Sequence, residues 1–290
     1  SDESRGLGDV YKRQIDAMRE SFGLTNDPIF IQYVSYLKSI LKGELGTSIA
    51  YFPAPVSEII SNGLGWTIFL AGISMIIAFL IGTTLGIIIA WNRTGKLDTI
   101  LPPTLAFFGA FPYFWLAMVF LYLFGFSLNW FPIGRAYGNE INPGYNLPFF
   151  ISALYHAFLP ALTLVFVSLG GWMLSMRNTM ISTLGSDYIT FAHAKGIPSK
   201  LIMLRYAARN AILPNLTGFG MALGFMLSGA LLTEMIFSYP GQGFLLLQAV
   251  QTQDYPLMQG IFMTITLAVL GANWLVDLSL IHISEPTRLV

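Results

Sequence analysis

Cysteine is absent from this chain of 290 residues, which excludes disulfides, thiolate metal sites and a cysteine nucleophile. Charged residues are scarce: they make up 10% of the chain, against about 25% in soluble domains. The three histidines, His156, His193 and His282, are far apart in sequence, which argues against a histidine metal site. The formal net charge is zero, which argues against nucleic-acid binding.

Catalytic motifs are also missing. Gly95-Lys96 would end a phosphate-binding loop, but Ala90 stands where that motif requires its first glycine. We find no G-x-S-x-G, no H-E-x-x-H and no paired carboxylates within apolar segments. The sequence therefore predicts a protein that is not an enzyme and has no cofactor of its own, so that any ATP must be bound by a partner subunit.

Apolar residues dominate what is present. They make up 54% of the chain, mean hydropathy is +0.64, and five runs each approach or exceed the roughly 20 residues that cross a bilayer. The runs are Gly65–Trp91, Ile100–Phe126, Phe149–Met176, Ala211–Phe237 and Leu257–Asp277. We therefore expect an all-α, polytopic bundle of membrane helices in contact with lipid. Gly82-x-x-x-Gly86 in the first run predicts close packing between helices of this chain.

Charge in the connectors predicts the orientation of the spans, because lysine and arginine are retained on the cytoplasmic side. Asn92–Asp98 and Asp187–Pro214 are basic and are predicted to be cytoplasmic. Ser127–Pro148 and Ser238–Pro256 carry few charges and are predicted to be external. This alternation places the mixed, amphipathic segment Ile15–Asn62 outside the membrane, with one helix and then an extended stretch before the first complete span.

The basic connector Asp187–Pro214 has an internal pattern. Gly196 followed by Pro198 predicts a break between two short helices, because glycine ends a helix and proline begins one. After the break, apolar residues recur at three- and four-residue spacing, which predicts one apolar stripe. Its members are Leu201, Leu204, Ala208 and Ile212. Such a helical hairpin either covers the end of the helix bundle or presents a protruding surface to a cytosolic protein. Charge and periodicity do not favour one of these two interpretations over the other.

Two motifs in this connector resemble a known family. Ala192-x-Ala194-Lys195-Gly196, followed by R-N-A-I-L-P ending at Pro214, is similar to the coupling-loop signature of ABC importer permeases, in the dipeptide, oligopeptide and nickel branch. The glutamate of the broader signature is replaced by Thr190, as is usual in the peptide branch. The resemblance implies that residues 180–210 form a cytoplasmic coupling loop.

The resemblance also implies a role and partners. Ala192, Ala194, Lys195 and Gly196 would seat in a cleft of a cytosolic ATP-binding subunit, and Pro214 would fix the return into the membrane. A second homologous permease subunit would complete the path, and an extracytoplasmic substrate-binding protein would deliver the substrate. Peptides are the first expectation, with oligosaccharides or nickel as alternatives. A secondary transporter is the alternative from another class.

An acidic residue near the end of the fourth run needs its own interpretation. Glu234, Pro240-Gly241-x-Gly243 and Asp254-Tyr255-Pro256 resemble a stretch of the same peptide branch. A carboxylate in an apolar run is costly and usually faces protein or water. We favour a structural carboxylate, solvated or paired, over a place on the substrate path, and Pro-Gly-x-Gly predicts a turn before a short helix.

Both ends of the chain resemble the two translated strands of one short DNA element, a transposon end used in sequencing. Ser1–Gln14 and Leu278–Val290 are therefore predicted to be assembly scars. Between them we expect an external segment, residues 15–62, and a permease transmembrane domain, residues 63–277. The family's sixth, N-terminal span would then be missing.

Overall fold

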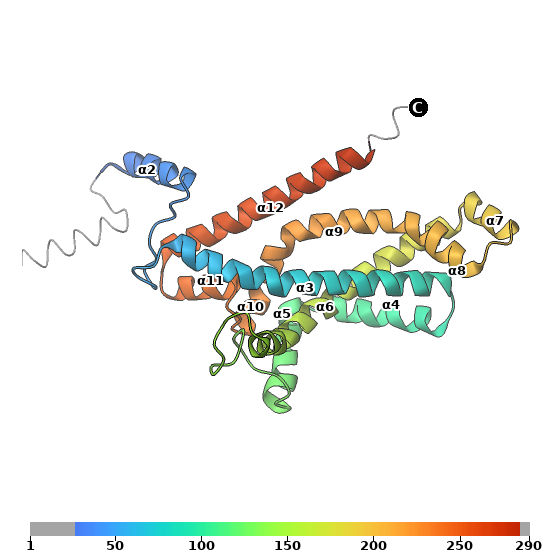
Figure 1. Ribbon diagram of the computed structural model, residues 1–290, viewed down its shortest axis with the longest axis horizontal. Coiled ribbons are helices and arrows are strands. Elements are labelled where there is room, and N and C mark those ends of the chain that lie inside the picture. Colours follow the sequence, from blue (N-terminus) through green and yellow to red (C-terminus); the bar gives the residue numbers. More distant parts are fainter. Residues whose placement is uncertain (1–26, 285–290) are drawn as a thin grey trace, which may run out of the picture. The chain divides into compact units, whose positions relative to one another are not determined.

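The computed structural model describes residues 27–284, and the regular secondary structure of these residues is helical, apart from an isolated antiparallel bridge between Thr47 and Pro55. The all-α prediction is confirmed (Figure 1). The elements are α2 (Ile29–Leu41), α3 (Val56–Trp91), α4 (Lys96–Gly109), α5 (Tyr113–Phe120), the π-helix η1 (Leu121–Ser127), α6 (Leu147–Leu184), α7 (Asp187–Ala194), α8 (Ser199–Leu201), the π-helix η2 (Ile202–Ala208), α9 (Arg209–Gly229), α10 (Leu231–Ile236), α11 (Gln242–Gln251) and α12 (Tyr255–Ser284).

Within residues 27–284, three helices are long and apolar enough to cross a membrane, or four if one bent pair forms a single span. The three are α3, α6 and the part of α12 from Tyr255 to Leu275, and the bent pair is α4 with α5 and η1. These elements contain four of the five predicted apolar runs. The fifth, residues 211–237, is divided between α9 and α10.

The predicted run 100–126 is bent by 96° between α4 and α5. Pro112 precedes α5 with an extended backbone, and the residue before a proline is disfavoured in helical conformation. The break therefore lies where the sequence places a helix start. Pro102 and Pro103, in contrast, are accommodated inside α4.

The described chain divides into two compact units, and the first combines residues 27–64 with 245–264. It holds α2, the segment 42–55, the start of α3, most of α11 and the start of α12. One expectation is corrected here: residues 48–55 form turns closed by the Thr47–Pro55 bridge and are not extended. Helix α3 begins directly after them at Val56 and runs without a break to Trp91.

The second unit comprises residues 65–244 and 265–284, and α6 is its centre because it contacts α4, α5, α9, α10 and η2. The predicted glycine motif brings α3 against α6. A Cβ built on Gly86 would lie 2.7 Å from the Met173 carbonyl oxygen, and one built on Gly82 would lie 2.7 Å from Trp172 Cβ. The expectation of packing within the chain is thus confirmed for this motif.

Several predicted boundaries lie outside the described residues. These are the N-terminal scar at residues 1–14, the first part of the external segment at residues 15–26, and residues 285–290 of the C-terminal scar. The backbone of α12 continues through Leu278 to Ser284. The assignment of residues 278–290 to a scar stays a prediction.

Candidate functional site

The predicted hairpin lies at one end of the second unit, where α6 ends and α9 begins (Figure 1). Helix α7 stops at Ala194, and Gly196 then adopts a positive φ of 73°, a conformation that side chains with a Cβ disfavour. The Gly196 amide donates to the His193 carbonyl at 2.9 Å, which closes the turn. Pro198 precedes α8, so the predicted break between two helices is confirmed.

The five residues expected to couple to an ATPase differ in exposure. Ala194, Lys195 and Gly196 are exposed at the turn, and a Cβ on Gly196 would meet no atom within 4 Å. Ala192 is 2% exposed and faces the interior of its own unit. Pro214 is exposed within α9 rather than at a turn. The structure therefore brings three of the five together on one surface.

The buried side of α7 belongs to a hydrophobic cluster that joins five elements. Ile189 and Ala192 from α7 pack into the same cluster as Met176 and Met180 from α6, and Ala90 from α3. Each of these five side chains is at most 2% exposed. The cluster also includes four residues of η2 and the start of α9, namely Ile202, Ala207, Ala208 and Ala211. Helix α7 therefore shares one core with α3, α6, η2 and the start of α9.

The predicted apolar stripe after the break is confirmed at Ala208, which is buried, and at Ile212, which packs against the same cluster, but it is wrong at Leu204. Leu204, which the helical spacing places on the stripe, is 56% exposed, whereas Ile202 and Ala207 are fully buried. The cause is the π-helix η2, in which the hydrogen bonds run from residue i+5 to residue i and each turn holds an additional residue. Burial therefore follows a five-residue step from Ile202 to Ala207 and then a four-residue step to Ala211.

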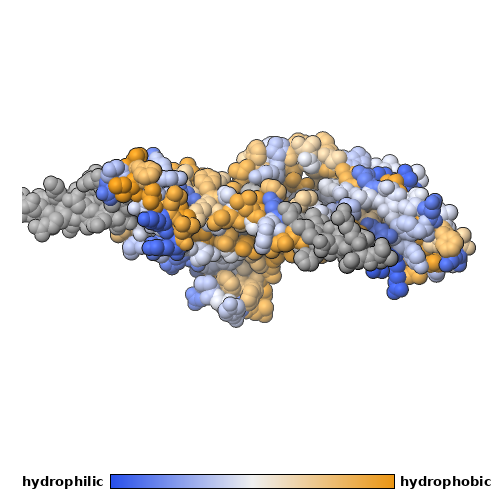
Figure 2. Space-filling view, turned by 90° about the horizontal axis from the view of Figure 1, so that it is seen from above, coloured by the Kyte–Doolittle hydropathy of each residue, from blue (hydrophilic) through white to orange (hydrophobic). Residues whose placement is uncertain are grey.

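The outer side of α7 presents an aromatic ring. Phe191 is 62% exposed, and Lys195 Nζ lies 4.6 Å from its ring centroid. A cation over a ring face is attracted by the quadrupole of the ring. Nearby, Asn210 Nδ2 donates to the Tyr188 hydroxyl at 3.0 Å and so ties α9 to α7. Hydrophilic surface gathers at the end of this unit that carries α7 (Figure 2).

An ion pair joins two helices of the same unit. Arg177 Nε on α6 donates to Asp98 Oδ1 on α4 at 2.6 Å. The Arg177 side chain is 23% exposed and that of Asp98 is 10% exposed, so water screens the pair in part. The two residues are 79 positions apart in the sequence, so their spacing gives no signal for this pair.

Asn215 forms a polar junction inside the bundle that the sequence analysis missed. This residue on α9 is 1% exposed. Its Oδ1 accepts from Ser175 Oγ on α6 at 2.6 Å, and its Nδ2 donates to Thr83 Oγ1 on α3 at 3.4 Å. The available signal was an asparagine within an otherwise apolar run, because a buried amide must find partners.

Glu234 is fully buried, so of the two structural forms we expected, the solvated one is wrong. Its Oε2 accepts from the Gly243 amide at 2.7 Å, inside the turn that Pro240 begins. A Cβ on Gly241 would overlap with the Glu234 carboxyl group, and a Cβ on Gly243 would overlap with the Leu231 backbone. The two glycines of the motif therefore make room for the carboxyl group and for α10. A place on the substrate path stays a prediction.

A second buried carboxylate, Asp254, organises the first unit. Its Oδ2 accepts from Ser48 Oγ at 2.5 Å and from the amides of Ile49 and Ala50 at 2.9 and 3.0 Å. Its Oδ1 accepts from the Leu257 amide at 3.1 Å and so caps the start of α12. Four donors from two distant segments thus converge on one carboxylate of 0% exposure.

Tyr51 lies at the tip of the same turn and donates through its hydroxyl to Gln248 Oε1 on α11. Burial of the phenol, and then the nearby Asp254 carboxylate, raise the pKa of Tyr51 above its usual value. Phe52 beside it is 54% exposed. The turn is therefore fixed at its base and presents an aromatic side chain at its tip.

Known proteins with similar sequences agree with the motifs. A protein of Brucella suis biovar 1 that carries a peptide-permease name is 36% identical over 269 residues, which are 92% of this chain and 82% of the relative. The oligopeptide transport system permease protein AppB of Bacillus subtilis is 32% identical over 89% of this chain and 80% of the relative. The dipeptide transport system permease protein DppB of Alkalihalophilus pseudofirmus is 35% identical over 90% and 82%.

Family membership follows from a second comparison. Residues 82–286 match the family described as the binding-protein-dependent transport system inner membrane component. This is a family of transport permeases and not of enzymes, and it is not a family of secondary transporters. Together with the apolar helices, the match makes the protein a multi-pass component of the inner membrane. The chain belongs to the inner membrane permeases of ABC importers, in the branch that includes the peptide permeases.

Proposed function

We propose that this chain forms the path by which an ABC importer moves peptides across the inner membrane, and that the exposed end of α7 couples the path to a cytosolic ATPase. The observation that supports the coupling most directly is the hairpin itself. Its outer surface offers Ala194, Lys195 and Gly196 without neighbouring atoms of this chain over the glycine, while its inner surface belongs to a cluster that reaches three long helices.

The mechanism needs no chemistry from this chain. An ATPase that binds the exposed turn more tightly in one state of the path shifts the population toward that state. Because Ile189 and Ala192 are packed against Met176 and Met180, α7 cannot move without moving α6. Close-packed interiors transmit such displacements since they have little free volume. Because Ala192 is buried, its proposed role is in this transmission, while Ala194, Lys195 and Gly196 are proposed to make the contact.

The partners follow from this arrangement. Two ATP-binding subunits would bind the α7 turns of this chain and of a second, homologous permease subunit. A binding protein would deliver the peptide at the outer side, in keeping with the family description. Peptides are proposed as the substrate because the named relatives are an oligopeptide and a dipeptide permease.

The test is substrate-stimulated ATP hydrolysis and peptide uptake by the complete transporter in proteoliposomes. Gly196→Glu places a bulky charge on the exposed turn, and we expect it to abolish stimulation by peptide-loaded binding protein. Gly43→Glu is a matched control, because Gly43 also has a positive φ, 80°, and no atom within 4 Å of a built Cβ. Both changes add about 1–2 kcal/mol of backbone strain, so only coupling separates them. Retained stimulation in Gly196→Glu would refute the proposal.

A further inference from the structure

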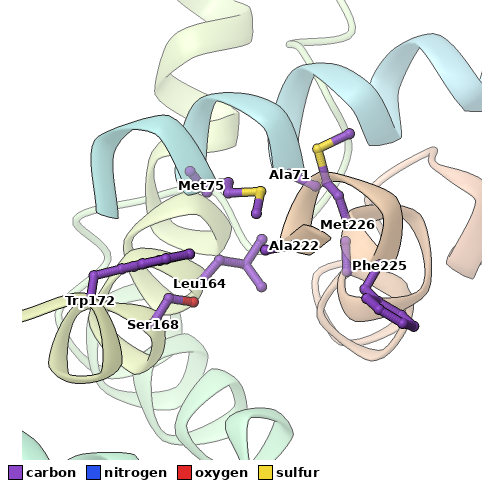
Figure 3. A pocket seen from close by; sticks show the side chains of 10 residues that line it. Ala71, Met75, Leu164, Ser168, Trp172, Ala222, Phe225 and Met226 are labelled. Atoms are coloured by element: carbon purple, nitrogen blue, oxygen red, sulfur yellow. The ribbon is translucent and has the colours of Figure 1, made fainter. Parts of the chain in front are cut away.

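A cavity of about 300 Å³ lies within the second unit, between α3, α6 and α9 (Figure 3). Met75 lines it from α3, Ser168 and Trp172 from α6, and Ala222 and Met226 from α9. Its volume falls at the lower end of the range of about 300–1,000 Å³ that is typical of ligand pockets. It is large enough for one or two residues of a peptide.

The cavity lies near the middle of the long helices. Met75 is 19 residues from the start of α3 and 16 from its end, and Ser168 is 21 residues from the start of α6 and 16 from its end. At a rise of about 1.5 Å per residue, each end is roughly 24–32 Å away along the helix axis. The hydrocarbon core is only about 30 Å thick, so both residues lie inside it when these helices span the bilayer.

Ser168 is exposed, unlike Ser74 and Thr163, which are buried in these helices. Ser74 Oγ donates to the Leu70 carbonyl at 2.6 Å, and Thr163 Oγ1 donates to the Leu159 carbonyl at 3.0 Å. The Ser168 hydroxyl and the Trp172 indole N–H make no such bond to any residue between 27 and 284, and both side chains line the cavity. An unpaired polar group in hydrocarbon costs several kcal/mol. Ser168 is exposed and Trp172 is half-buried, so both groups are free to bond a polar group of a molecule that enters the cavity.

The rest of the lining is apolar and uncharged. The thioethers of Met75 and Met226 are flexible and adapt to differently shaped apolar groups. Trp172 is held by edge-on packing against Phe79, with ring centroids 5.3 Å apart, so the indole is a fixed wall. Such a lining accepts an aliphatic, aromatic or thioether side chain, while Ser168 and Trp172 reach the amide beside it. Nothing in the lining compensates a charged side chain.

We propose that this cavity is a subsite of the translocation path that receives an uncharged, mainly apolar side chain of the peptide in transit. Ser168 and Trp172 bond the backbone of the peptide, and the two methionines contact its side chain. This inference rests on the proposed function, since it takes its ligand from there. It adds where in the chain the peptide is held and which side chains the site accepts.

The absence of cysteine from this chain allows a direct test. Ser168→Cys introduces a single, nearly isosteric thiol into this subunit of the complete transporter. A water-soluble, permanently charged methanethiosulfonate reagent modifies only a hydrated thiol, because the thiolate is the reacting form. Modification of this subunit is followed by its mass, and uptake of labelled peptide is measured before and after.

We expect the thiol introduced by Ser168→Cys to be modified during turnover, and uptake to fall at least tenfold once it is modified. Excess trileucine, delivered by the binding protein, should slow modification severalfold more than triaspartate does. Two matched controls lie on the same helix. Leu154 is exposed outside the cavity and Thr163 is fully buried, and modification of neither Leu154→Cys nor Thr163→Cys should depend on peptide.

Two outcomes would overturn the inference and leave the proposed function standing. One is peptide uptake by the Ser168→Cys transporter with no modification of the thiol, which would mean that lipid or a second subunit fills the cavity. The other is full uptake after complete modification. Failure of the unmodified natural transporter to take up any peptide would refute the proposed function, and the inference with it.

Discussion

The Asp254 junction of the first unit gives a quantitative prediction. Asp254→Asn leaves one oxygen where the carboxylate had two, while four donors still converge on it. The side-chain oxygen can serve Ser48, Ile49 and Ala50, or it can cap Leu257, but it cannot do both. The amide N–H groups then face donors on the other side. Asp254 thus holds segment 48–50 to the start of α12 more strongly than any neutral side chain of its size.

The size of the effect follows from the bonds lost. A hydrogen bond to a charged group contributes about 1.5–3 kcal/mol, against about 1 kcal/mol for a neutral one. In Asp254→Asn, the amides of Ile49 and Ala50 would donate to a neutral oxygen instead of a carboxylate. The free energy of segment 48–50 in its hydrogen-bonded state, relative to its open state, should therefore rise by roughly 1–4 kcal/mol. Because about 1.4 kcal/mol is a factor of ten, amide exchange should accelerate roughly 5- to 1,000-fold.

Hydrogen exchange of the purified protein in detergent measures this directly, since Ile49 and Ala50 donate their own amides to Asp254. The peptide that contains these two residues should exchange faster in Asp254→Asn than in the natural protein, and peptides from α6 should be unchanged. Ser48→Ala removes one donor and should produce a smaller effect. Equal exchange at residues 49 and 50 in all three proteins would refute the assignment of Asp254 as the anchor.

Three further predictions concern the second unit, each measured by thermal unfolding in detergent. Gly86→Leu should lower the free energy of unfolding by about 1–3 kcal/mol or more, because the leucine side chain would meet the α6 backbone. Gly171→Leu should not, because no atom lies within 4 Å of a Cβ built on Gly171. Equal unfolding midpoints for the two variants would contradict the close contact at Gly86. Asp98→Asn should lower the free energy of unfolding by no more than about 1 kcal/mol, because Arg177 is partly exposed to water. High salt should reduce the difference between the variant and the natural protein. A larger loss of stability that does not depend on salt would contradict this. Glu234→Ala should lower the free energy of unfolding by about 2–4 kcal/mol, because it leaves the Gly243 amide without its acceptor. Glu234→Gln should keep both the stability and the peptide uptake of the natural protein. A transport defect in a stable Glu234→Gln variant would instead place this residue on the substrate path.

Local backbone chemistry was predictable from the sequence. The break at Gly196 and Pro198 needs only the conformational limits of those two residue types, and the structure has it where expected. The bend before α5 at Pro112 follows in the same way. Four of the five apolar runs lie in helices that can cross a membrane, because length and hydropathy decide this property without tertiary contacts.

Features that depend on partners distant in sequence were not predictable. Helical spacing places Leu204 on the buried stripe, which is wrong, because the π-helix η2 buries Ile202 and Ala207 instead. Asp98 and Arg177, or Ser48 and Asp254, are brought together only by the fold. A structural role for Glu234 could be predicted because a carboxylate in an apolar run is energetically costly. Its position inside the turn formed by Gly241 and Gly243 could not be predicted, because only the folded chain brings these residues together.

The contact between Gly86 and α6 has a mechanical consequence. At 2.7 Å from a built Cβ to the neighbouring backbone, no soft side chain stands between the two helices to take up strain. A force applied at the α7 turn would therefore not be absorbed where α3 crosses α6. The two helices would tilt together as one rigid body, and the proposed movement of the ATPase would displace their segments in the middle of the membrane.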